Sequence, residues 1–298
     1  MKKEISIIMP TINEESIFKL IDDIKKGFGN KAEIIVVDKS DESYYKRLVK
    51  KNVIVIKQQD SGYENAIMLG FKKATGKYLA TIDPDGTYPY QDLVNVYNKI
   101  KKDNLNAVFG NRFGGLSKGS MQNYIRFGNK SLTSIYQKLY NPNIKDVLTG
   151  VFIFDRKAFN IIKDATPYRA GTAFFAIEFA RHKLNIGEIS ILYLKRINGK
   201  SKLSKSKLFY GFGVAGHMVR YIRDYSPLLI FGLIGSLLII SGIIVGIFVV
   251  SNYIATGTLI EVGRALISFM LLVIGFLFII TGLILDMLRD IKSKLKEI

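Results

Sequence analysis

Two long uncharged apolar stretches near the C-terminal end constrain this chain more than any other feature. No Asp, Glu, Lys or Arg occurs from Tyr225 to Ile260 or from Ala265 to Leu285. A helix needs roughly 20 apolar residues to cross a bilayer, and neither stretch carries the polar stripe of a helix packed on a soluble core. The sequence therefore predicts two transmembrane helices, near Pro227 to Val250 and Gly263 to Leu285.

Charges around these stretches predict how the chain sits in a membrane. The link of residues 251–262 carries one charge, Glu261, whereas Lys and Arg crowd the sequence before the first stretch and after the second. By the positive-inside rule both termini face the cytoplasm. The start, Met-Lys-Lys-Glu followed by a strand-like run, is not a signal-peptide pattern. We expect a two-span cell-membrane protein whose soluble domain and termini are cytoplasmic, with residues 287–298 as a basic tail.

The strong positive charge indicates anionic partners. The formal net charge is +18, which suits nucleic acid, lipid headgroups or phosphorylated substrates. No acidic residue occurs from Ile189 to Arg223, directly before the first apolar stretch, where eight Lys and Arg meet the membrane surface. This location favours lipid over nucleic acid. Residues 207–226 are expected to form an amphipathic juxtamembrane segment at the headgroups, with a plain cytosolic connector as the alternative.

Residues 1–206 alternate short β-branched apolar runs with longer helical patterns. The runs predict five strands, Ile5–Pro10, Ile34–Asp38, Val53–Ile56, Tyr78–Asp83 and Ala107–Asn111. The intervening patterns predict four helices, Ile17–Lys26, Tyr44–Lys51, Glu64–Ala74 and Leu93–Asp103. Such alternation implies an α/β domain with a mostly parallel sheet, covered on both faces, that binds ligands outside the carboxyl ends of its strands. Residues 227–286, with the two spans and a short external loop, follow it.

Acidic residues stand where the predicted strands end. Asp83 and Asp85 flank Pro84 at the end of the fourth run. Two carboxylates there can hold a hard divalent cation against a diphosphate. The alternative is an Asx turn closed by Gly86. The first three strand ends supply further polar residues: Thr11, Asn13 and Glu14, then Asp38 and Ser40, then Asp60 and Ser61.

Two other nucleotide-binding patterns are not supported. Gly211, Gly213 and Gly216 match G-x-G-x-x-G, but they lie between a basic segment and an apolar span, where the motif needs a preceding strand. No G-x-x-x-x-G-K-[ST] sequence occurs, so nothing indicates an NTPase.

Seven short motifs occur in a characteristic order along roughly residues 4–205. They are Met9 to Glu14, Val36 to Asp38, Gly62 to Tyr78, Asp83 to Asp85, Gly110 to Phe113, Asp146 to Gly150 and Gly199 to Leu203. In this order they resemble the signatures of family 2 glycosyltransferases, in particular the polyprenyl-phosphate branch that includes dolichol-phosphate mannose synthase. The two-helix tail is similar to that of bacterial polyprenyl-phosphate glucosyltransferases. Lys39 and the pair Tyr63-Glu64 depart from the family pattern.

The resemblance implies a GT-A fold, a Rossmann-like mixed sheet, with defined site residues. Those implied for the nucleotide sugar are Pro10, Asn13, Glu14, Asp38, Asp60, Asp83 and Lys202. Asp83 and Asp85 are implied to bring Mg²⁺ or Mn²⁺ to the diphosphate. Arg112 and Arg126 are implied for a lipid phosphate, and Arg196, Ser201 and Lys202 for closing over the phosphates, with Ser201 also counted at the lipid phosphate. Asp85, Asp146 and Arg196 are the expected catalytic residues, Asp146 as a base or a positioning group.

These expectations combine into one leading hypothesis and two alternatives. The leading one is a metal-dependent, inverting transferase that moves a hexose from a UDP- or GDP-sugar to polyprenyl or dolichyl phosphate on the cytoplasmic leaflet. An anionic acceptor phosphate needs little general-base help, and Arg196 and Lys202 can stabilise the departing diphosphate. The alternatives are a glycolipid synthase that uses a neutral hydroxyl and a nonenzymatic nucleotide-sugar-binding scaffold. Processive members of the family share a Gln-x-x-Arg-Trp motif, and this chain has no Trp, which argues against processive synthesis. The two spans also allow the chain to form a homo-oligomer.

Overall fold

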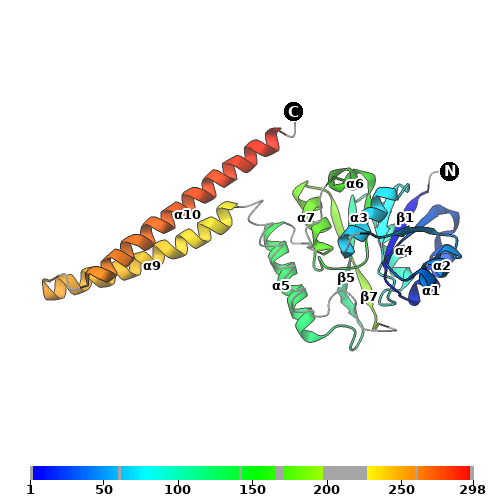
Figure 1. Cartoon of the computed structure of the whole chain (residues 1–298), viewed down its shortest axis with the longest axis horizontal. Helices are drawn as coiled ribbons and strands as arrows, with labels where there is room; N and C mark the ends of the chain where they lie inside the picture. The colour runs from blue at the N-terminus through cyan, green and yellow to red at the C-terminus, as the bar shows by residue number, and fades with distance from the viewer. Residues whose placement is uncertain are drawn as a thin grey trace. The chain divides into compact units, whose positions relative to one another are not determined.

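The computed structural model describes residues 3–59, 62–140, 143–164, 171–196, 227–258 and 261–295. The chain divides into two compact units, residues 1–215 and 216–298, and each is described by itself (Figure 1). The predicted juxtamembrane segment, 207–226, lies outside the described residues, as do Asp60, Ser201 and Lys202.

A seven-stranded mixed sheet forms the centre of the first unit, in the order β3-β2-β1-β4-β6-β5-β7. The strands are β1 Ile5–Thr11, β2 Ala32–Asp38, β3 Ile54–Lys57, β4 Tyr78–Thr81, β5 Ala107–Leu116, β6 Phe152–Asp155 and β7 Ile186–Tyr193. All neighbours pair in parallel except β6, which is antiparallel to both β4 and β5. The mixed α/β sheet implied by the sequence is thus confirmed, with β6 and β7 added to the five predicted strands.

Helices cover both faces of this sheet. They are α1 Ser16–Phe28, η1 Gly29–Lys31, α2 Glu42–Val49, α3 Tyr63–Lys73, α4 Tyr90–Lys102, α5 Asn123–Leu139, α6 Arg156–Ile162 and α7 Ala173–Arg181. Apolar residues of α1, α2 and α4 pack on one face in a single core cluster. On the other face α3 and α7 meet β6 through aromatic rings, with the Phe71 and Phe154 centroids 4.7 Å apart and those of Phe152 and Phe175 4.9 Å apart. The four predicted helices are confirmed, and α5 to α7 were not predicted.

The direction of the strands decides what meets at the functional edge. Because β6 runs against its neighbours, the residues that precede it reach the same edge as the carboxyl ends of β1, β2, β4, β5 and β7. β4 ends at Thr81, two residues earlier than predicted. Asp83 and Pro84 therefore lie beyond the ladder, as expected for a proline that has no N–H to donate.

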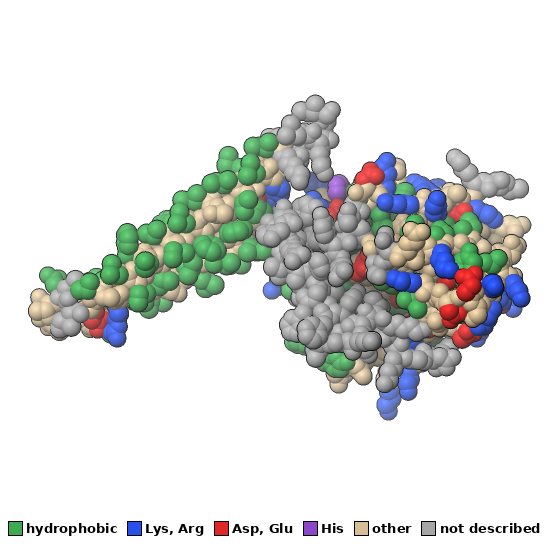
Figure 2. Space-filling view, viewed as in Figure 1, with side chains coloured by type: hydrophobic (Ala, Val, Ile, Leu, Met, Phe, Trp, Pro, Cys, Tyr) green, Lys and Arg blue, Asp and Glu red, His purple; other side chains and the backbone are tan. Residues whose placement is uncertain are grey.

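The second unit is a pair of long apolar helices, α9 Pro227–Thr256 and α10 Val262–Leu295. Each has a mean hydropathy of 2.8 over its most apolar window, of which 17% is buried, so each is long and apolar enough to cross a bilayer. Figure 2 shows hydrophobic side chains along the visible face of the pair. These helices extend past the predicted ends, Val250 and Leu285.

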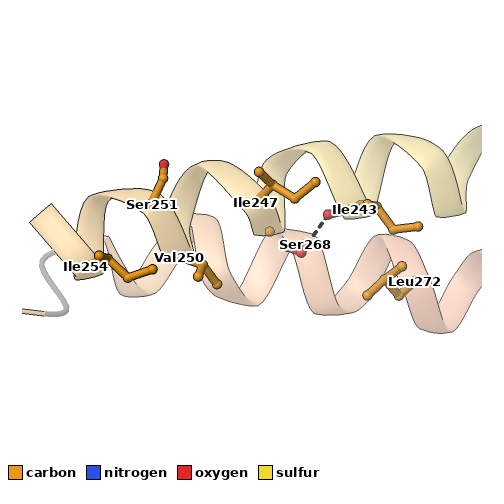
Figure 3. Close-up of a pocket in the computed structure, with 9 residues that line it drawn as sticks. Ile243, Ile247, Val250, Ser251, Ile254, Ser268 and Leu272 are labelled. Atoms are coloured by element: carbon orange, nitrogen blue, oxygen red, sulfur yellow. Dashed lines mark hydrogen bonds between the residues drawn. The ribbon is translucent and has the colours of Figure 1, made fainter.

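Small residues spaced seven apart let the two helices approach closely. They are Gly235 and Gly242 on α9 and Ser268, Gly275 and Gly282 on α10. A Cβ built on Gly235 would lie 2.6 Å from the carbonyl oxygen of Gly275, and the Ser268 hydroxyl donates to the Gly242 carbonyl at 2.7 Å. Beside this contact an open apolar groove lies between Ile243 and Ile247 of α9 and Leu272 of α10 (Figure 3). Close backbone approach and a buried serine are typical of helix pairs in lipid.

Candidate active site

Two carboxylates form the centre of the site, just past the end of β4. The phenol of Tyr63 donates to Asp83 Oδ1 at 2.5 Å. Asp85 Oδ1 accepts from the backbone and hydroxyl of Thr87 at 3.1 and 2.6 Å. The Ser16 hydroxyl donates to the carbonyl of the intervening Pro84 at 2.6 Å and ties the turn to α1. The Asx turn considered as the alternative to a metal site forms at Asp85 rather than at Asp83, since Asp85 Oδ1 is the acceptor of the Thr87 N–H.

Asp83 is held in a confined, low-dielectric position. A Cβ on Gly150 would lie 2.1 Å from Asp83 Oδ2, so only glycine fits at position 150 without displacing the carboxylate. Burial, together with the neighbouring charge of Asp85, raises the pKa of Asp83 to about 7, and the Tyr63 hydrogen bond only partly offsets this. A buried pair of like charges is stabilised by a cation, and carboxylate oxygens are the ligands that Mg²⁺ and Mn²⁺ prefer.

Arg196 joins the site from the segment after β7. Its Nη2 donates to Glu14 Oε1, and its Nη1 lies 3.6 Å from Asp85 Oδ2. The chain thus brings together three residues that the sequence had assigned separately: Glu14 after β1, Asp85 after β4 and Arg196 after β7. The guanidinium already stands beside the acidic pair, where a diphosphate held by a cation would be expected.

Arg112 and Asp146 form a buried ion pair close enough to Asp83 for the Arg112 charge to lower the pKa of that carboxyl. The guanidinium donates to both carboxylate oxygens, at 2.6 Å from Nε and 2.8 Å from Nη2, with side-chain exposures of 8% and 0%. The backbone N–H groups of Arg112 and Leu148 also donate to Asp146, at 3.1 and 3.2 Å. Burial lowers the pKa of Arg112, but the Asp146 carboxylate together with Tyr88 and Tyr193 raises it by more, so the Arg112 pKa stays well above its ordinary value. Both oxygens of the expected base are therefore committed to donors.

Glu188 on β7 holds the loop that carries Asp146. Its Oε1 accepts from the backbone N–H groups of Lys145 and Asp146 at 2.6 and 3.0 Å, and its Oε2 accepts from the Asn111 amide at 3.0 Å. Tyr193, also on β7, places its ring 5.5 Å from the Arg112 guanidinium carbon. Neither residue was predicted, since an isolated Glu or Tyr in a strand gives no local signal of a partner in another loop.

A second cluster lies at the ends of β1 and β2. Asp38 Oδ1 accepts from the Ser40 backbone and hydroxyl at 3.0 and 2.5 Å, and the Ser40 hydroxyl accepts from the Asn13 N–H at 2.7 Å. Asn13 has a φ of +48°, a left-handed conformation that Asn tolerates. Asp38 Oδ2 is buried and accepts no hydrogen bond from any residue the structure describes. Such an oxygen is a ready acceptor for an N–H or O–H of a ligand.

The remaining predicted residues are distributed as follows. Pro10 lies in β1, past the last residue of that strand that pairs with β4, so its missing N–H removes nothing from that ladder. Arg126 is exposed on α5. Within the described part of the chain no group of three or more His, Cys, Asp or Glu is arranged to hold a metal. Asp83 and Asp85 would supply two ligands, and phosphate and water the rest, as is usual for Mg²⁺.

Comparisons with known proteins agree with this geometry. The family model for glycosyl transferase family 2 matches residues 6–162. The low-salt glycan biosynthesis hexosyltransferase Agl6 of Haloferax volcanii is 27% identical over 198 residues, 64% of this chain and 48% of that protein. The dolichyl-phosphate hexose transferase of the same organism is 29% identical over 203 residues, 67% of this chain and 86% of that protein. The chain thus spans about half the length of Agl6 and most of the second relative.

A solved structure supports the fold independently. Glucosyl-3-phosphoglycerate synthase of Mycobacterium tuberculosis, in complex with Mn²⁺, uridine diphosphate and glucosyl-3-phosphoglycerate, gives a TM-score of 0.55 at 17% identity, covering 73% of this chain and 79% of that one. At this identity the likeness establishes the GT-A fold alone. Together with the family match over more than half of the chain, it leads to one conclusion: the chain is a member of glycosyl transferase family 2.

Proposed function

We propose that this chain transfers a hexose from a nucleoside diphosphate sugar to polyprenyl or dolichyl phosphate in a membrane, with inversion at the anomeric carbon. The observation that carries the proposal is the cluster of Asp83, Asp85 and Arg196 at the carboxyl edge of the sheet, in a chain with two helices long enough to span a bilayer. The name of one relative, a dolichyl-phosphate hexose transferase of which this chain covers 86%, supports the same acceptor class.

The donor would bind along the edge formed by β1, β2 and β4. Asp38, with its buried acceptor oxygen, and Asn13 suit the nucleoside. Asp83 and Asp85 would hold Mg²⁺ or Mn²⁺, which when bound neutralises charge that develops on the departing diphosphate. Arg196 lies 3.6 Å from Asp85 and can add charge-assisted hydrogen bonds to the same phosphates. Asp60 and Lys202 remain proposals for this donor site, as does Ser201 for the phosphates.

The state of Asp146 favours a phosphate acceptor over a neutral hydroxyl. A hydroxyl needs a base to take its proton, but both oxygens of Asp146 accept from Arg112. A lipid phosphate is already anionic, so one of its oxygens can attack the anomeric carbon while the bond to the diphosphate breaks and the nucleoside diphosphate leaves with the electron pair. No proton has to move. We propose that Asp146 positions Arg112, and that Arg112 and Arg126 attract the acceptor phosphate.

The test is a transfer assay with the full-length protein in vesicles. The protein is incubated with Mn²⁺ or Mg²⁺, a panel of UDP- and GDP-sugars and either dolichyl phosphate or dolichol, and the lipid product is identified by mass and its anomeric configuration by NMR. We expect a product with inverted configuration from dolichyl phosphate only. A product from dolichol would support the neutral-hydroxyl alternative, and no product from any donor would support a scaffold.

Asp85→Asn gives this assay its internal control. The substitution removes a charge and nearly keeps the volume, so we expect transfer to fall by about 10²-fold or more, as when a major electrostatic stabiliser is lost. Asp22→Asn, at an exposed acid of α1 paired with Lys51, should leave the rate unchanged. Full transfer by the Asp85 variant would exclude Asp85 from the metal site.

A further inference from the structure

Helix α5 presents an apolar face to solvent. Tyr124, Phe127 and Ile135 are 53%, 75% and 42% exposed, and they lie at positions i, i+3 and i+11, which share one side of a helix. Single exposed apolar residues are ordinary on a protein surface. Three on one face of one helix, including the most exposed aromatic side chain among the described residues, form a patch.

The opposite side of α5 is fixed to the catalytic unit. Tyr136 is 1% exposed, and its hydroxyl donates to the Ala176 carbonyl at 3.1 Å. The Gln137 amide donates to the Ile144 carbonyl at 2.9 Å, and the buried Thr133 hydroxyl accepts from the Val147 N–H at 3.4 Å. The first bond joins α5 to α7, and the other two join it to the loop that carries Asp146. The outward face is therefore presented at a fixed orientation relative to the candidate active site.

The charge around this face has one sign. Between Asp103 and Asp146 the chain contains no acidic residue. Arg126, Lys130 and Lys138 are all exposed on α5. A helix with aromatic and aliphatic residues on its outer face, basic neighbours and no acid is the pattern of a segment that lies in the headgroup region of an anionic bilayer.

We propose that the α5 face of Tyr124, Phe127 and Ile135 docks on an anionic lipid bilayer and brings the active-site edge to the acceptor phosphate. The inference extends the proposed function, because it rests on a chain anchored in a membrane by α9 and α10. Aromatic rings are most stable at headgroup depth, and the exposed Lys130 and Lys138, three positions after Phe127 and Ile135 on α5, would lie beside the anionic headgroups. A second copy of the chain is the competing occupant of this face.

The absence of cysteine allows a direct test in the full-length protein. Phe127→Cys is labelled with an environment-sensitive fluorophore and reconstituted in vesicles with or without anionic lipid and with lipids that carry a quencher on the acyl chain. Val49→Cys on α2 is the control, since Val49 is also an exposed apolar residue on a helix, at 50%. We expect quenching at position 127 and not at 49, stronger with anionic lipid and weaker at high salt.

Two results would overturn the proposal. Equal quenching at positions 127 and 49 would mean that α5 contacts lipid no more than α2 does. If the lipid quencher does not reduce the fluorescence at position 127, but dilution of the protein in lipid changes it, a second copy of the chain is the occupant.

A functional variant separates this inference from the proposed transfer reaction. Phe127→Ser should raise KM for a long-chain, membrane-embedded acceptor by about tenfold, the order expected from the lost burial of one aromatic side chain. The rate with a short, water-soluble polyprenyl phosphate should stay unchanged, as should both rates in Val49→Ser. Normal transfer by Phe127→Ser in vesicles would contradict docking through α5 while leaving the proposed function intact. Loss of transfer to both the membrane-embedded and the water-soluble acceptor would contradict the proposal that the α5 face acts on membrane docking alone.

Discussion

At the scale of single residues, the environment of Asp83 makes the stability of the catalytic unit depend on pH. The pKa of Asp83 is raised from 3.8 to about 7, first by burial and then by the charge of Asp85. At a pH between 3.8 and about 7, Asp83 in the folded protein keeps a proton that it has released in the unfolded chain. Without a metal ion, stability therefore falls as the pH rises through this window, and the loss is complete above pH 7.

This sign predicts that Asp83→Asn stabilises the metal-free protein. The melting temperature in detergent, followed by circular dichroism, should rise by a few °C at pH 8 and by less at pH 5. Added Mn²⁺ should stabilise the native protein and not the variant. Asp103→Asn is the control, because hydrogen bonding by Lys99 lowers the pKa of that exposed acid. Removing the Asp103 charge should therefore not raise the melting temperature. A metal-free Asp83 variant less stable than the native protein at pH 8 would contradict this account.

Tyr63 departs from the family pattern, and the structure gives it a contact with Asp83. Its hydroxyl donates to Asp83 Oδ1 at 2.5 Å, and it thereby lowers the Asp83 pKa. Groups that orient a metal ligand typically change metal affinity by 10- to 100-fold. For Tyr63→Phe we expect about a tenfold weaker affinity for Mn²⁺, measured by electron paramagnetic resonance titration. Tyr45→Phe, on α2 beside Lys57, should bind Mn²⁺ like the native protein, and so would Tyr63→Phe if the contact had no role.

At the scale of elements, the antiparallel strand β6 determines the composition of the site. The register Thr81 with Phe152 and Leu79 with Phe154 places the preceding residues, Asp146 to Gly150, at the edge where β4 delivers Asp83. A parallel β6 would have carried this loop to the opposite edge. The buried face of β6 is aromatic, and its packing on Phe71 and Phe175 holds this orientation.

The two long helices provide a prediction at this scale. A Cβ on Gly275 would lie 2.8 Å from the Gly235 carbonyl oxygen and 2.7 Å from Ile239 Cγ1. Gly275→Leu should force the helices apart and destabilise their pairing by about 1–3 kcal/mol, as overpacking does. The melting temperature of the full-length protein should fall. Gly263→Leu is the matched control on α10, since no atom lies within 4 Å of a Cβ built there. Equal effects of the two variants would exclude the glycine contact as their cause.

At the scale of the whole molecule, we propose that the paired helices anchor the chain in the bilayer and that the catalytic unit binds the donor. A polyprenyl phosphate keeps its hydrocarbon in the bilayer, so a catalytic unit anchored there meets the acceptor at a raised effective concentration. Anchoring by itself does not change the donor site, whose described residues all belong to the first unit. We retain the proposal that residues 1–206 form the cytoplasmic catalytic domain and that both termini are cytoplasmic.

Removing the helices should separate donor binding from transfer. A chain that ends at residue 206 should bind the nucleotide sugar with nearly native affinity, measured by calorimetry, yet transfer poorly to a membrane-embedded acceptor. It should regain activity with a short, water-soluble polyprenyl phosphate, for which anchoring gives no advantage. Circular dichroism supplies the control for folding. Loss of donor binding in the folded, shortened chain would mean that the helices contribute to the donor site.

The sequence by itself determined the features that depend on neighbouring residues. Uncharged runs of more than 20 residues specify helices long enough for a bilayer. Alternating periodicities specify five strands and four helices, and the Asp-Pro-Asp triplet places two acids at the end of the fourth strand. The ordered motifs identified the family. Strand β6 escaped prediction because a four-residue apolar run has no helical or alternating period to distinguish it.

Only the tertiary structure decided which of these residues meet. Glu14 and Arg196 are 182 positions apart, and their contact depends on β1 and β7 both delivering their ends to one edge of the sheet. The pairing of Asp146 with Arg112 depends on the reversed direction of β6. The bond from Tyr63 to Asp83 depends on α3 packing on β1, where Gly70 lies against Ile8. Local periodicity carries no information about strand order or direction, because these follow from how the whole core packs.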